Sequence, residues 1–349
     1  MNSRIRPALA ALALAVAVAQ PARAQQLTGA GATFPYPIYS KWFDVYHEKT
    51  GVAINYQSIG SGAGIQQVKS GTVDFGASDA AISDAALKDM PRRVVHVPTV
   101  GGAVVLAYNL PGFEGRVQLT PELVAGIYLG DITTWNDKRI AAANPGLTMP
   151  AAPILAVHRS DGSGTTNIFT LYLSAISSRW KDLAGAATSV SWPSGVGGKG
   201  NEGVSGVVKQ TPGAIGYVEL AYAKQNQFPI ALVRNKSGKY VEPSAASVTA
   251  AMAGAAAQLA KDVRTPIVNS PAPDAYPISG LTFLIVYQDA KDSARGLALA
   301  RFLDWAIHDG QQYADALDYA RLPEAIVKVN EGTLKMLTAG GKKLVAANP

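Results

Sequence analysis

The stretch VVHVPTVGGAVVLAYNL (94–110) is an apolar, strand-like run that is long enough to leave one domain and enter another. A second run of this kind, YPISGLTFLIVYQ, covers 276–288. Elsewhere helical and strand patterns alternate along the chain, and these two runs interrupt that alternation. We therefore interpret them as paired crossovers between a first domain, formed by 25–103 and 275–349, and a second domain formed by 104–274.

The alternating part of the sequence predicts an α/β fold. Residues 37–51 (PIYSKWFDVYHEKTG) have the pattern of a helix that ends at Gly51, and AINYQSI (53–59) follows as a strand. A short helix from Ile65 then precedes the strand VDFGAS (73–78). Strand–helix alternation over this length favours domains built on mostly parallel sheets that are flanked by helices.

The first 24 residues have the features of a secretory signal peptide. Arg4 and Arg6 form a basic start, 7–19 is a short apolar run, and Ala-Arg-Ala (22–24) is a cleavage site of the A-x-A type. The leader carries three arginines and no acid, so its removal lowers the formal net charge from +6 to +3. No second stretch approaches the roughly 18 apolar residues of a membrane span. We expect a soluble protein of the bacterial periplasm.

Composition and motifs exclude several classes of function. The 349 residues are 48% hydrophobic and 16% charged, which is ordinary for a globular chain with room for two domains. The basic residues are scattered, whereas a nucleic-acid partner needs a concentrated basic patch. There is no cysteine, and the four histidines have no metal-ligand spacing. Signatures of P-loop, dinucleotide-binding and serine-hydrolase sites are missing, so we expect no cofactor, no metal and no enzyme activity.

Four turns combine glycines with hydroxyl side chains: GAGATF (29–34), GSGAG (60–64), GASDA (76–80) and DGSGTT (161–166). Each follows a strand pattern and precedes a helix pattern, so the turns should gather at the carboxyl ends of strands, where α/β proteins bind ligands. There the first N–H groups of each helix have no internal partner, and glycine permits close approach. The four turns together predict a site for a tetrahedral oxyanion that needs no metal.

The candidate side chains also have plainer structural interpretations. Thr33 could cap a helix that follows it, with Phe34 as a core aromatic, and Ser61 could be an ordinary loop serine. Asp79 could cap a helix, since Asp is a preferred N-cap residue.

The charged candidates have such interpretations too. Arg159 and Asp161 could form a surface ion pair, which contributes about 0–1 kcal/mol. Lys199 could contact an anion, but a solvated loop lysine is the simpler interpretation.

Five motifs in order closely resemble the periplasmic phosphate-binding proteins of ATP-driven phosphate importers. They are LTGAGATFPYPIYSKW (27–42), VDFGASDAAIS (73–83), DGSGT (161–165), WPSGVGGKGNEG (192–203) and PGAIGYVE (212–219). The resemblance runs over essentially the whole chain after the leader. It implies a two-lobed fold of the type II solute-binding class, with a two-crossover hinge, that closes over one phosphate and docks on a membrane permease. It also implies a protein that acts as a monomer.

The resemblance assigns ligand roles in the first lobe to four residues. Thr33 and Phe34 would offer the threonine hydroxyl and backbone N–H groups. Ser61 would offer its hydroxyl and N–H, although Gly62 stands where the family often has a second serine. Asp79 would accept a phosphate proton.

In the second lobe, the resemblance implies that Arg159 makes a charge-assisted contact with phosphate and is held in position by Asp161. Ser163, Gly164 and Thr165 would complete the cradle at a helix start.

The expected mechanism is capture without chemical change. Phosphate keeps a proton at neutral pH and can donate it to Asp79, whereas sulfate has none, so a buried carboxylate selects phosphate. Sites of this kind reject a lookalike by roughly 10⁴–10⁵-fold. The alternatives are a binding protein for another oxyanion such as sulfate or molybdate, a secreted phosphatase, and a surface protein that uses the fold for adhesion.

Overall fold

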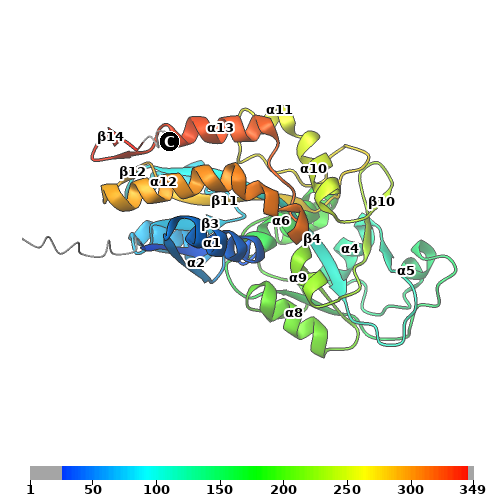
Figure 1. The fold of residues 1–349 in the computed structure, drawn as a ribbon. Helices are drawn as coiled ribbons and strands as arrows, with labels where there is room; N and C mark the ends of the chain where they lie inside the picture. The colour runs from blue at the N-terminus through cyan, green and yellow to red at the C-terminus, as the bar shows by residue number, and fades with distance from the viewer. Residues whose placement is uncertain (1–25, 345–349) are drawn as a thin grey trace, which may run out of the picture.

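The computed structural model describes residues 26–344, so the leader predicted for residues 1–24 lies outside it. An eight-stranded sheet in the order β2-β1-β3-β11-β4-β8-β6-β7 forms the centre of the fold (Figure 1). Its strands are β1 (Gln26–Gly31), β2 (Ala53–Ser58), β3 (Phe75–Ser78), β4 (Val94–Tyr108), β6 (Leu155–Arg159), β7 (Val196–Gly198), β8 (Ala214–Glu219) and β11 (Ser279–Tyr287). One smaller sheet contains β5 (Gln118–Leu119), β9 (Leu232–Arg234) and β10 (Tyr240–Val241). Another contains β12 (Asp289–Ala290), β13 (Thr338–Ala339) and β14 (Lys342–Lys343).

Helices flank both halves of the sheet. They are α1 (Tyr36–Thr50), α2 (Ser61–Ser70), α3 (Asp84–Lys88), α4 (Pro121–Leu129), α5 (Lys138–Ala143), α6 (Gly164–Ile176), α7 (Ser178–Leu183), α8 (Gly200–Gln210), α9 (Leu220–Gln225), α10 (Ala245–Ala253), α11 (Ala256–Leu259), α12 (Ser293–Ile307) and α13 (Glu324–Leu334), with 3₁₀ turns at Asp309–Tyr313 and Asp315–Leu317. In Figure 1, α1, α2, α12 and α13 surround one half, while α4, α5, α8 and α9 lie around the other. Within the described residues, no helix is long and apolar enough to cross a bilayer.

The predicted α/β architecture is confirmed, with one addition at the centre of the sheet. The outer pairings β1–β2, β1–β3, β6–β7 and β6–β8 are parallel, whereas β4 and β11 are antiparallel to each other and to their outer neighbours. Strand β4 pairs with β11 up to Ala103 and with β8 from Val104 onward. The two long apolar runs of the sequence are therefore neighbouring strands, and β4 belongs to both halves of one continuous sheet.

The direction of the strands makes the two halves face each other. Strand β3 runs in the same direction as β4 and ends at Ser78, level with Pro98 across β11. Strand β8 runs against β4 and ends at Glu219, opposite Val104. The carboxyl ends of both sets of parallel strands thus point toward the middle of β4, which brings the turns that follow them together.

Several local predictions agree with the structure and one was wrong. Helix α1 ends at Thr50, and Gly51 closes it in the left-handed conformation with φ of 71°. Helix α2, however, begins at Ser61 and not at Ile65. Gly60, at φ of 92°, reverses the chain just before it, so the glycine-rich turn itself forms the first turn of the helix.

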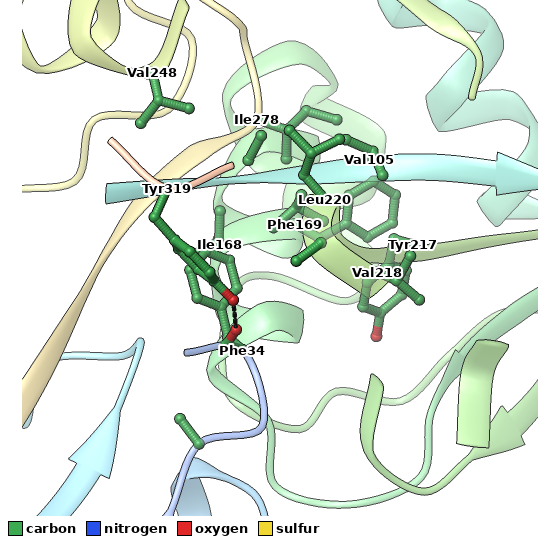
Figure 2. Packing of buried hydrophobic residues seen from close by; sticks show 14 of the residues in the cluster. Phe34, Val105, Ile168, Phe169, Tyr217, Val218, Leu220, Val248, Ile278 and Tyr319 are labelled. Atoms are coloured by element: carbon green, nitrogen blue, oxygen red, sulfur yellow. Dashed lines mark hydrogen bonds between the residues drawn. The ribbon is translucent and has the colours of Figure 1, made fainter. Parts of the chain in front are cut away.

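The core is continuous across the middle of the sheet. All fifteen residues of β4 are buried, which explains why its sequence is apolar without alternation. Figure 2 shows Val105 of β4 among buried side chains of the second half, including Phe169 and Tyr217, whose rings stack at 4.5 Å. The Tyr319 hydroxyl donates to the Phe34 carbonyl at 2.7 Å (Figure 2).

Gly31 at the end of β1 cannot carry a side chain. Its φ is +146°, and a Cβ there would lie 2.0 Å from the Ala77 carbonyl oxygen. We expect Gly31→Ala to lower the free energy of unfolding by about 3–5 kcal/mol in urea titrations. Gly206→Ala is the matched control, because Gly206 lies in α8 with open space around it and should be neutral or slightly stabilising. Equal stabilities of the two variants would contradict the steric argument.

Candidate anion-binding site

Turns from the two halves of the sheet touch directly. The Gly62 N–H donates to the Gly162 carbonyl at 2.8 Å, and the Gly164 N–H donates to Ser61 Oγ at 3.0 Å. Gly62 follows β2 and Gly164 follows β6, so both glycines lie beyond the carboxyl end of a strand. At Gly164, a Cβ would lie only 2.5 Å from Asp79 Oδ2, so the approach of the two turns requires glycine there.

Ser61 is the first residue of α2 and is fully buried. Its Oγ accepts hydrogen bonds from the backbone N–H groups of Gly164 at 3.0 Å and Asp79 at 3.3 Å. The interpretation as an ordinary loop serine is therefore wrong, because this hydroxyl links a turn of each half-sheet.

Asp79 is a buried carboxyl with one oxygen left unpaired. Its Oδ1 accepts from the Thr282 hydroxyl at 2.7 Å, while its Oδ2 has no hydrogen-bond partner among residues 26–344. It does not cap a helix, because α3 starts at Asp84 and is capped by Ser83. Burial raises the pKa of Asp79 to about 7, against the opposing effects of the Thr282 hydrogen bond and the Arg159 charge. A buried carboxyl oxygen without a hydrogen-bond partner is energetically costly, which makes Oδ2 a candidate contact for a ligand.

The Arg159 and Asp161 side chains form the ion pair that the sequence suggested, but not at the surface. Arg159 Nε and Nη2 donate to Asp161 Oδ1 and Oδ2 at 2.8 and 2.5 Å, and the arginine side chain is 1% exposed. Burial acts to raise the pKa of Asp161, but the hydrogen bonds and charge of Arg159 outweigh it and lower that pKa. Asp161 Oδ1 also accepts from the Gly200 N–H at 3.0 Å. The bidentate contact with Asp161 thus fixes the plane of the Arg159 guanidinium.

Thr33 is buried and belongs to a cross-sheet network, not to a helix cap. The residue before α1 is Pro35, and no side chain caps that helix. Thr33 Oγ1 accepts from the backbone N and Nδ2 of Asn201, at 3.2 and 2.7 Å, and the Thr33 carbonyl accepts from the Tyr222 hydroxyl at 2.7 Å. The Phe34 ring is fully buried, as expected of a core aromatic.

The start of α6 offers fewer free donors than the resemblance implied. Ser163 caps the helix by accepting from the Thr166 N–H, and its own N–H donates to the Thr188 carbonyl at 2.8 Å. The Gly164 N–H binds Ser61, as described above. Among residues 26–344, the backbone N–H groups without a partner in these turns include those of Phe34, Ser61 and Thr165.

Three residues of this site carried no signal in the sequence strong enough to single them out: Asn201, Tyr222 and Thr282. Thr282 lies 203 positions from the carboxyl it contacts, inside a strand whose apolar pattern indicates core. Asn201 lies in the motif GGKGNEG, whose lysine is the more evident candidate for an anion contact, but Lys199 is exposed. No group of three or more His, Asp or Glu side chains within the described range is placed to hold a metal ion.

The raised pKa of Asp79 predicts a pH-dependent stability in the absence of a ligand. The folded protein keeps this proton up to a pH of about 7, whereas an aspartate in the unfolded chain loses it near its ordinary pKa of 3.8. Asp79 therefore stabilises the folded protein fully below pH 3.8. This stabilisation, about 4 kcal/mol in the free energy of unfolding, is lost as the pH rises from 3.8 through 7.

Urea titrations of the wild type and Asp79→Asn between pH 4 and 8, in phosphate-free buffer, measure this effect as a difference. Subtracting the two free energies of unfolding cancels the contribution of His96, which both proteins share. Burial lowers the pKa of His96 to about 4, so its titration stabilises the folded protein as the pH rises, opposite to the effect of Asp79. A difference that stays constant with pH would show that Asp79 titrates normally.

Comparison with known proteins shows which sequences are similar to this chain. The model of the PBP superfamily domain matches residues 16–309. The "Phosphate-binding protein PstS" of Xylella fastidiosa is 45% identical over 311 residues, covering 89% of this chain and 85% of that protein. The protein of the same name from Pasteurella multocida is 44% identical over 307 residues, covering 88% and 89%.

Solved structures share the fold. A high affinity periplasmic phosphate-binding protein bound with phosphate superposes with a TM-score of 0.69 at 24% identity, covering 88% of this chain and 93% of that one. A phosphate ABC transporter substrate-binding protein with bound phosphate from Clostridium perfringens gives 0.61 at 17% identity, covering 86% and 100%. Sequence identity over nearly the whole described chain, together with this fold, shows that the chain belongs to the PstS phosphate-binding proteins of the PBP superfamily.

Proposed function

We propose that this protein captures inorganic phosphate between the two halves of its sheet and delivers it to an ABC-type membrane importer. The observation that carries the proposal is the buried, unpaired Oδ2 of Asp79, which lies beside Gly164 at the start of α6. The names of the relatives, which are phosphate-binding proteins, support the same ligand.

The donors come from both halves of the sheet. The N-terminal ends of α2 and α6 carry the unpaired N–H groups of Ser61 and Thr165, and the partial positive charge of a helix start favours an anion there. The Arg159 guanidinium adds a full charge, and Asp161 fixes its orientation. With Thr33, Phe34, Ser163 and Gly164, these residues form the phosphate site in this proposal.

Asp79 gives the site its selectivity. A phosphate that keeps one proton donates it to Oδ2 and satisfies the buried carboxylate. Sulfate and molybdate are fully deprotonated, so they would place an oxygen lone pair against that carboxylate. The resulting repulsion and unpaired acceptor disfavour those ions.

The two halves act as lobes that close on the ligand. In this proposal one lobe comprises 25–103 and 275–349, the other 104–274, and β4 and β11 form the hinge between them. The pairing partner of β4 changes between Ala103 and Val104, which supports a boundary at that point. Phosphate favours the closed form because only that form brings donors of both lobes to it.

The remaining parts of the proposal concern location and chemistry. A leader at residues 1–24 would export the protein to the periplasm, where it works as a monomer and meets the permease. Phosphate is bound and released without covalent change, since neither a hydrolase motif in the sequence nor any observation on the described residues favours a phosphatase.

Isothermal titration calorimetry of the purified protein tests the function. We expect tight 1:1 binding of phosphate and binding of sulfate and molybdate that is weaker by roughly 10⁴-fold or more. Preferential binding of sulfate or molybdate would assign the protein to another oxyanion. Steady turnover of a chromogenic phosphate monoester would instead identify a phosphatase.

A further inference from the structure

Three buried hydroxyls of the site share an unusual hydrogen-bond pattern. Each accepts two hydrogen bonds from N–H groups. Thr33 Oγ1 accepts from the N and Nδ2 of Asn201, and Ser61 Oγ accepts from the N–H groups of Gly164 and Asp79. Thr165 Oγ1 accepts from Arg159 Nη1 at 3.4 Å and from Asn201 Nδ2 at 3.2 Å.

This pattern determines where the hydroxyl hydrogens can go. A hydroxyl has one hydrogen to donate and two lone pairs with which to accept. When two N–H donors occupy both lone pairs, the hydroxyl can take part in a further hydrogen bond only as a donor. None of the three donates to another residue among 26–344. Each is therefore set to donate to a ligand.

Asn201 donates three of these six hydrogen bonds, and its own orientation is fixed. Its side chain is fully buried, and its Oδ1 accepts from the Glu219 backbone N–H at 2.9 Å. Because that contact requires the oxygen, the amide cannot be turned over, and Nδ2 must face the hydroxyls of Thr33 and Thr165. Thr33 follows β1 in one half of the sheet, whereas Thr165 lies on α6 in the other.

We propose that Asn201 is a positioning residue that fixes the Thr33 and Thr165 hydroxyls as donors toward the bound anion, one from each half of the sheet. This inference rests on the proposed phosphate-binding function and deepens it. Asn201 does not need to touch phosphate. Its side-chain amide occupies one lone pair on each of the two hydroxyls, and the Asn201 N–H and Arg159 Nη1 occupy the others, which leaves the Asp79 carboxyl as the acceptor for a ligand proton.

Calorimetry with phosphate measures the effect of removing the amide. Asn201→Ala frees one lone pair on each threonine hydroxyl, so both hydroxyls can turn away or accept, and we expect the affinity for phosphate to fall at least about 30-fold. Asn144→Ala is the matched control. Asn144 is buried, accepts from the Gln118 N–H and donates to the carbonyls of Gln118 and Ile140, away from the site. This control should lose stability but keep its affinity.

Asn201→Asp serves as a second variant if the alanine variant folds poorly. It keeps an acceptor for the Glu219 N–H and nearly the same shape, but replaces the Nδ2 donor with an oxygen that attracts both hydroxyl hydrogens. We expect it to lose at least as much affinity as Asn201→Ala.

A double-mutant cycle separates positioning from general support of the structure. Thr33→Val and Thr165→Val together remove the two hydroxyls, so in that background Asn201→Ala should change phosphate affinity by less than about threefold. An equal loss in both backgrounds would show that Asn201 acts only through the packing of the site, and the inference would be wrong. If the wild type itself fails to bind phosphate, the proposed function fails first, and the inference fails with it.

Discussion

Asp79→Asn is expected to remove most of the preference for phosphate over sulfate, by about 10⁴-fold in the ratio of their affinities. In the wild type, the Thr282 hydroxyl donates to Asp79 Oδ1 at 2.7 Å. The asparagine retains an oxygen that can accept this hydrogen bond. Its amide nitrogen then replaces the unpaired Oδ2 and can donate to an oxygen of sulfate. Sulfate binding should therefore strengthen, while phosphate loses the acceptor for its proton and binds more weakly.

Competition calorimetry with both anions at pH 8 measures the ratio. Asp74→Asn is a suitable control, since Asp74 is a largely buried carboxyl that pairs with Arg295 and lies outside the site. The control should discriminate as the wild type does. If Asp79→Asn still rejects sulfate, the selectivity lies in the donors and not in this carboxyl.

Gly164→Ala is expected to lower phosphate affinity by at least about 1000-fold. A Cβ at this position would lie 2.6 Å from the backbone nitrogen of Asp79, which belongs to the opposite half of the sheet and cannot move aside as a side chain could. The two turns would separate, and the contact between the Gly164 N–H and Ser61 Oγ would be lost. The direct contact between the two halves of the sheet at this site then becomes inaccessible.

Calorimetry measures the loss, and far-UV circular dichroism verifies that the fold is kept. Alanine is a better helix former than glycine, so a weakened α6 cannot account for the lost affinity. Gly206→Ala, in α8 with open space around it, should bind phosphate as the wild type does. Near-normal affinity in Gly164→Ala would mean that phosphate does not need the two turns in contact.

Local patterns in the sequence were sufficient for the architecture. The alternation of strand and helix predicted the α/β fold, because periodic burial follows from the geometry of each element. The two long apolar runs predicted the strands β4 and β11, because a strand that is buried on both faces has a continuous apolar sequence instead of alternating apolar and polar residues. The glycine-rich turns marked the carboxyl ends of strands, where helix starts leave N–H groups unpaired.

The Arg159–Asp161 pair was also accessible to sequence reasoning, because its two members are only two residues apart. What the sequence left open was whether the pair lies at the surface or in the interior. Its burial depends on α6, whose Thr165 accepts from Arg159, and on the start of α8, where the Gly200 N–H donates to Asp161; the packing of these helices is tertiary.

The roles of Asn201 and Thr282 could be decided only by the tertiary structure. Their contacts span 168 positions to Thr33 and 203 positions to Asp79, and no local pattern distinguishes such a residue from core or loop. The same holds for the unpaired Oδ2 of Asp79, because its burial depends on the approach of α6 from the other half of the sheet. The sequence by itself determined which turns present donors, through glycine, hydroxyl and strand–helix patterns. The antiparallel pairing of β4 with β8 and β11 decided that these turns face one another, because strand direction across a sheet is a property of the assembled chain.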